Sequence, residues 1–143
     1  MNQVLQLVAG DFPQLKERLP QVLAGGNLVL LLCAQWCGTC RTFRDMTDEL
    51  AGKFPETLFV WLDVEDDSDV AGDVDVTNFP SIAVFRQGVA VHFGVSLPQA
   101  GVVQRLLNAL FHNAVHEADV ADEVAELPQL LQQWLLDETE AGC

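Results

Sequence analysis

The feature that most constrains the fold of this chain is the apolar run LVLLLCA at residues 28–34. It shows no alternation with polar residues, so a strand formed here would have both of its faces covered by other parts of the protein. Continuous apolar strands of this kind are typical of parallel sheets that carry helices on both faces. The run is also far shorter than the roughly 18 residues of a membrane-spanning helix. We therefore expect a central strand in an α/β domain.

The segments around this run alternate between strand and helix patterns. Their order is β-α-β-α-β-(α)-β-β-α, which favours an α/β fold in which a mixed central β-sheet is flanked by helices on both faces. Strands are predicted at residues 3–8, 28–34, 57–64, 81–85 and 89–93, with helices that begin near residues 11, 37 and 96. The last two strands form a hairpin that turns through residues 86–88.

Two details of the first helix are predicted from single residues. Asp11 can cap its amino terminus, with Gln14 three residues further on, as in a capping box. Pro20 is expected to kink or end the helix, because proline lacks the backbone N–H and clashes with the preceding turn.

An acidic segment follows the last strand and helix of this pattern. Its apolar residues recur at helical spacing, and Pro128 suits the first turn of a second helical piece. We predict a domain at residues 1–115 and an acidic amphipathic helical extension at 116–143. Residues 117–139 are expected to be helical and to lay Leu127, Leu131 and Trp134 on the domain, or on a partner or second copy of the chain.

The charge and the cysteine content exclude several functions. With 21 acidic and 7 basic residues the net charge is −14, so nucleic acids and anionic membranes are poor partners. Four cysteines are too few for a disulfide scaffold in a chain of 143 residues. The first residues lack the basic and apolar regions of a signal peptide. We expect a soluble, cytoplasmic protein, in a reducing compartment where a C-x-x-C pair is catalytic or binds a metal.

The pair Cys37 and Cys40 carries the chemistry that the sequence predicts. A cysteine at the start of a helix lies where free N–H groups and the helix dipole stabilise a thiolate, which is the reactive form. The second cysteine lies one turn further on the same face and can attack a mixed disulfide made by the first. Redox chemistry is the favoured interpretation. A zinc or iron–sulfur site, which would need further ligands, and a merely structural pair are the alternatives.

Several motifs in order resemble the thioredoxin-like family. AQWCGTCRTF is similar to the W-C-G-x-C active site at a strand-to-helix turn, LFVWLDVED to the third strand, and FPSIAVFRQGVAVHFG to the proline loop and terminal hairpin. The resemblance covers roughly residues 3–112. It implies a thioredoxin fold and no cofactor or metal. It also implies catalytic roles for Cys37 and Cys40, and substrate contacts from Trp36, Gly38, Thr39, Phe79 and Pro80.

The chain departs from thioredoxin itself in the active-site motif and at positions that handle protons. Thr39 replaces the proline of C-G-P-C, Leu31 occupies the place of a buried acid, and Trp61 that of a lysine. We expect Cys33 to be an inert buried thiol. The resemblance implies a thiol-disulfide oxidoreductase that acts on disulfides of client proteins, with a dithiol or a reductase as electron donor. The alternative is a thioredoxin-fold binding module or chaperone-like adaptor, whose helical tail holds one partner.

Overall fold

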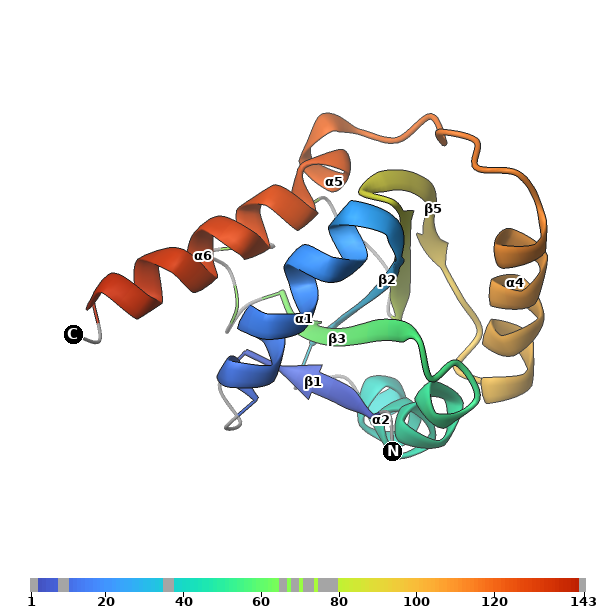
Figure 1. The fold of residues 1–143 in the computed structure, drawn as a ribbon. Coiled ribbons are helices and arrows are strands. Elements are labelled where there is room, and N and C mark those ends of the chain that lie inside the picture. The colour runs from blue at the N-terminus through green and yellow to red at the C-terminus, as the bar shows by residue number, and fades with distance from the viewer. Residues whose placement is uncertain are drawn as a thin grey trace.

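The protein is a five-stranded mixed β-sheet with helices on both faces, as predicted (Figure 1). The computed structural model describes residues 3–7, 11–34, 38–64, 67, 70, 74 and 80–141. The strand order is β1-β3-β2-β4-β5. The strands are β1 (Val4–Gln6), β2 (Asn27–Cys33), β3 (Thr57–Asp63), β4 (Ser81–Arg86) and β5 (Val89–Val95).

The apolar run forms β2, which is the middle strand of the sheet. It pairs in parallel with β3 and antiparallel with β4, so both of its edges are hydrogen-bonded. All its residues from Leu28 to Cys33 are buried. The prediction of a central strand with both faces covered is therefore confirmed.

Two hydrophobic cores lie on opposite faces of the sheet. Alternate β2 residues divide between them, with Leu28, Leu30 and Leu32 in one core and Val29 and Leu31 in the other. The first core is covered by α1 (Phe12–Gly25), α5 (Asp122–Ala125) and α6 (Leu127–Ala141), and the second by α2 (Gly38–Gly52) and α4 (Ala100–His112).

The hairpin between β4 and β5 turns through two residues. Gln87 and Gly88 both have positive φ, at 56° and 80°, which matches the tight turns that suit the twist of a hairpin. Arg86, predicted as part of the turn, is the last residue of β4. Its guanidinium donates to the carbonyl oxygens of Leu110 and Asn113, at 3.0 and 2.5 Å, and so holds the end of α4 against the sheet.

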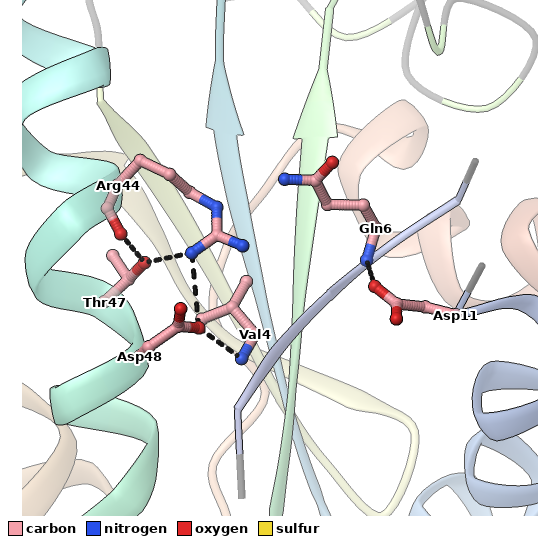
Figure 2. Close-up of polar contacts among 6 residues, drawn as sticks. All are labelled: Val4, Gln6, Asp11, Arg44, Thr47 and Asp48. Carbon is pink, nitrogen blue, oxygen red and sulfur yellow. Dashed lines mark hydrogen bonds and ion pairs between the residues drawn. The ribbon is translucent and has the colours of Figure 1, made fainter. Parts of the chain in front are cut away.

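The open edge of β1 is closed by two carboxylates (Figure 2). The backbone N–H of Val4 donates to Oδ1 of Asp48 on α2, at 3.0 Å, and that of Gln6 donates to Oδ2 of Asp11, at 2.8 Å. Arg44 holds Asp48 in place through an ion pair of 3.2 Å. Asp11 occupies the N-cap position of α1, as predicted, but the capping-box prediction is wrong, because its side chain makes no capping hydrogen bond and accepts from the edge strand instead.

Pro20 does not end the first helix. The helix α1 continues to Gly25, with Leu15, Leu19 and Val22 buried on one side. Pro20 and Lys16 are exposed, so water can reach the carbonyl that a proline at this position leaves without an N–H partner. The burial of apolar side chains before and after Pro20 outweighs the free-energy cost of the backbone hydrogen bond that proline cannot donate.

The carboxyl-terminal extension packs against the same chain. In Figure 1 the chain leaves α4, passes the edge of β5 and brings α6 alongside α1. The N–H of Ala118 in this crossing donates to the Ala90 carbonyl of β5 at 2.8 Å. The buried apolar side chains of α5 and α6 include Val124, Leu127, Leu131 and Leu135, and Trp134 packs partly buried against them.

The predicted helical extension is confirmed in α5 and α6 but not throughout. Residues 114–121 form neither helix nor strand, because the chain needs them to cross from one face of the sheet to the other. Pro128 lies in the first turn of α6, as predicted. The division of the chain at residue 115 stays a prediction.

Burial of α6 predicts its contribution to stability. Leu131 is 0% exposed and Leu136, on the same helix, is 49% exposed. Leu131→Ala should lower the free energy of unfolding by about 2–5 kcal/mol, because it removes buried methyl groups and leaves a cavity. Leu136→Ala should change it by no more than about 0.5 kcal/mol. Urea denaturation of both variants measures this, and equal effects would show that α6 is not docked in solution.

A second prediction concerns pH. His92 on β5 is partly buried, and this burial lowers the pKa of its imidazole below the ordinary 6.5. As the pH falls below 6.5, His92 becomes protonated in the unfolded chain before it does in the folded protein. The free energy of unfolding therefore decreases as the pH falls from 6.5 to the lower pKa of the folded state. His92→Gln should therefore lose less stability than the wild type over this pH window. An NMR titration of His92 with a midpoint at or above 6.5 would contradict the prediction.

Candidate active site

Three residues from separate segments meet at the carboxyl end of β2. Cys33 pairs with Asp63 of β3, and the pairing of Leu32 with Ser81 brings Pro80, just before β4, next to Cys33. All three are buried. A hydrogen bond from Val64 N–H to the Cys33 carbonyl joins the ends of β2 and β3. Another, from Ser96 N–H to the Pro80 carbonyl, joins the start of β4 to the end of β5, and both are 2.9 Å long.

The side chain of Cys33 lies on the face of the sheet that α2 covers. Strand residues alternate between faces, so Cys33 shares a face with Val29 and Leu31 of the core beneath α2. Cys40, in the first turn of α2, lies against it, and the two sulfurs are bonded as a disulfide with a Cα–Cα distance of 5.9 Å. Cys33 is 0% and Cys40 1% exposed.

This pairing corrects the expectation for Cys33. The sequence identifies Cys33 as an inert buried thiol, but the structure places it in bonding contact with the predicted resolving cysteine. Cys33 and Cys40 lie in different elements, a strand and a helix, so neither the helical nor the strand periodicity of the sequence predicts that they are in contact. It arises because the chain reverses direction between β2 and α2, and the helix packs back on the strand that precedes it.

The exposed part of the site is the start of α2. Gly38 and Thr39 are both exposed, and the Thr42 hydroxyl donates to the Gly38 carbonyl at 3.2 Å. A Cβ built on Gly38 would meet only the end of Arg41, at 3.8 Å, so this backbone is open to a ligand. Three predicted residues, Trp36, Cys37 and Phe79, lie outside the described residues, as does Cys143. The pairing of Cys37 with Cys40 therefore stays a prediction.

The substituted proton-handling positions have new surroundings. Leu31 is completely buried in the core beneath α2. Trp61 is partly buried, and the guanidinium of Arg44 lies over its ring at 5.6 Å from the centroid, a cation–π contact. Neither position offers an acid or a base to the cysteines.

Asp63 is a candidate site residue that sequence reasoning missed. It is 8% exposed, and alternation with Phe59 and Trp61 places its side chain on the same face of the sheet as Cys33. Its own N–H donates to Oδ2 of Asp67 at 2.8 Å, which orders the chain after β3. The sequence did contain a signal for Asp63. It is the first acidic residue after the apolar residues of the third strand, and it lies at the edge of the sheet where β2, the strand that carries Cys33, also ends.

The described residues show neither a metal centre nor a membrane span. Among them, no three His, Cys, Asp or Glu side chains are grouped so that they could hold a metal ion. No helix within the same residues has the length and apolar character to cross a bilayer.

Comparison with known proteins identifies the family. The thioredoxin family model matches residues 14–108. The chain is 36% identical over 76 residues to the H-type thioredoxin of Fagopyrum esculentum, which covers 52% of this chain and 66% of that protein. It is 29% identical over 86 residues to thioredoxin of Ophiophagus hannah, which covers 59% of this chain and 80% of that one.

Solved structures agree on the fold. Thioredoxin from Trypanosoma brucei brucei superposes with a TM-score of 0.60 at 19% identity, over 78% of this chain and 94% of that one. Thioredoxin f2 in complex with ferredoxin:thioredoxin reductase gives a TM-score of 0.59, also at 19% identity, over 76% and 96% of the two chains. The chain belongs to the thioredoxin family and has the thioredoxin fold, with helices added after its last strand and helix.

The burial of the cysteine pair predicts its reactivity. In the reduced, folded protein Cys33 and Cys40 should react with iodoacetamide far more slowly than in guanidinium, because both thiols are enclosed between β2 and α2. Mass spectrometry of timed samples locates the label on each cysteine. Rapid labelling of either residue in the folded, reduced protein would show that α2 does not shield the pair.

Proposed function

We propose that this protein is a thiol-disulfide oxidoreductase that reduces or exchanges disulfides in client proteins. The observation that carries the proposal is the position of Cys40, which is 1% exposed one turn behind the exposed start of a helix in a thioredoxin fold. A cysteine so placed is protected from solvent and from other thiols. It is suited to resolve a bond that a more accessible neighbour has made.

The proposed reaction has two exchange steps. The Cys37 thiolate attacks one sulfur of a client disulfide, so a mixed disulfide forms and the other client sulfur leaves as a thiolate. The Cys40 thiolate then attacks Cys37 Sγ, which releases the second client thiol and leaves a Cys37–Cys40 disulfide. A dithiol or a reductase returns both electrons. The reducing environment of the cytoplasm fits this cycle.

An exposed apolar patch beside Pro80 supports contact with clients. Val95 and Leu97 are each 60% exposed and flank Ser96, whose N–H bonds to the Pro80 carbonyl. Large apolar side chains exposed at such a position are typical of interaction surfaces. We propose that a client strand lies across this patch and the exposed backbone of Gly38 and Thr39, with Trp36 and Phe79 completing the contact.

The described structure is evidence against the alternative function, a binding module that holds its partner through the carboxyl-terminal helices α5 and α6. The apolar stripe of α6, including Leu127 and Leu131, is buried against the chain's own α1 and core. It is therefore not available to a client or to a second copy unless α6 leaves the domain.

Trapping experiments test the proposed roles. Cys40→Ser should accumulate a covalent adduct with client proteins that a reductant releases, because the mixed disulfide loses its resolving thiol. Cys37→Ser should form almost none, and the wild type should reduce insulin in the presence of dithiothreitol. The function would be refuted if the wild type were inactive and neither variant trapped a client. Equal trapping by both variants would reverse the assigned roles.

A further inference from the structure

We infer that Cys33 is a third redox-active cysteine. It attacks the Cys37–Cys40 disulfide and converts it, by disulfide exchange, into a buried Cys33–Cys40 disulfide. The inference rests on the proposed function, because the reaction with a client supplies the Cys37–Cys40 disulfide from which the exchange begins. It adds a second oxidised form to the catalytic cycle, in which the attacking cysteine is free again.

The geometry of the pair meets the requirements of a disulfide. The Cα atoms of Cys33 and Cys40 are 5.9 Å apart, inside the usual range of about 4.4–6.8 Å. The two sulfurs face each other because β2 and α2 pack together at this point. Sheet pairing to β3 and β4 fixes the backbone of Cys33, and the first turn of α2 fixes that of Cys40. No movement of the backbone is needed to join them.

The exchange balances without any outside oxidant. The Cys33 thiolate attacks Cys40 Sγ of the Cys37–Cys40 disulfide, the Cys33–Cys40 bond forms, and Cys37 leaves as a thiolate. One disulfide is lost and one is gained, so no electrons enter or leave the protein. The step also balances in protons, because Cys33 gives up one proton and the departing Cys37 thiolate can take one up.

Burial gives the new disulfide a distinct property. With Cys33 at 0% and Cys40 at 1% exposure, external thiols and reductases have no access to either sulfur. The bond is reopened from within, when the Cys37 thiolate attacks Cys40 Sγ and restores the accessible disulfide. Cys37, meanwhile, is a free thiol without a resolving partner, so this form can begin an exchange with a client but cannot complete its reduction.

Disulfide mapping on the full-length protein tests the inference, in a Cys143→Ser background that removes the fourth cysteine. The oxidised protein is unfolded at mildly acidic pH, free thiols are blocked with N-ethylmaleimide, and disulfides are then reduced and labelled with iodoacetamide. Tandem mass spectrometry should find molecules with the first label on Cys37 and the second on Cys33 and Cys40. A signal no higher than the background of the Cys33→Ala variant would overturn the inference.

Two further variants separate exchange from damage to the fold. Cys37→Ser in this background is oxidised with diamide while it refolds from guanidinium, because both thiols are buried in the folded protein. After the product is unfolded again, Ellman's reagent should detect no thiol, and detection of both thiols would overturn the inference. Val29→Ala removes a small apolar side chain from the same strand and the same face, and should keep the wild-type disulfide pattern. A pattern altered as much by Val29→Ala as by Cys33→Ala would also count against it.

The outcomes distinguish this inference from the proposed function. If Cys40→Ser traps clients but mapping finds only Cys37–Cys40, the inference fails and the function stands. If the buried disulfide forms in Cys37→Ser but the wild type does not reduce insulin and Cys40→Ser traps no client, the proposed function fails and the exchange has no catalytic cycle to modify. If Cys37→Ser forms the Cys33–Cys40 disulfide but the wild type does not, Cys33 does not compete with Cys37 for Cys40, and the inference is wrong.

Discussion

Burial of β2 is the constraint on which the rest of the structure depends. Its side chains from Leu28 to Leu32 are at most 1% exposed, and each is worth about 1.5–3 kcal/mol when removed from water. That gain requires a neighbouring strand on each edge and a layer of helices on each face. The parallel pairing to β3, the antiparallel pairing to β4 and both helical layers follow from the need to enclose this strand. The same enclosure carries Cys33 to the edge of the sheet where α2 begins.

The two outer strands are protected by different means. An edge strand exposes free N–H and C=O groups that invite pairing with another chain. On β1 the outward N–H groups of Val4 and Gln6 are taken by the carboxylates of Asp48 and Asp11. On β5 the crossing between α4 and α5 contributes the N–H of Ala118. Some of the acidic residues that give the chain its charge of −14 therefore have a structural role.

The site combines an open start of α2 with a closed interior. Gly38 and Thr39 are exposed, whereas Cys40, Cys33, Asp63 and Pro80 are buried behind them. The acid that Leu31 cannot supply is present one strand away, at Asp63, on the same face of the sheet.

Local pattern was enough to determine the elements and the family. The apolar run gave a central strand because continuous apolar residues can be stable only where both faces are covered, and the order of W-C-G-x-C, proline loop and hairpin predicted the fold. The apolar face of α6 was also predictable from the sequence, because helical spacing places Leu127 and Leu131 on one side of the helix. Single-residue rules failed for the side chain of Asp11, which contacts β1 instead of capping α1, and for a helix end at Pro20, where packing around α1 outweighed the local preference.

The contact of Cys33 with Cys40 and the pairing of Cys33 with Asp63 were decided only by the tertiary structure. Both join segments that no repeat in the sequence relates, since they depend on the register of β2 with β3 and on the angle at which α2 returns over the sheet. The sequence determined which residues form strands and helices, because burial periodicity is local. The folded chain determined which of their side chains meet, because register and packing are properties of the whole sheet.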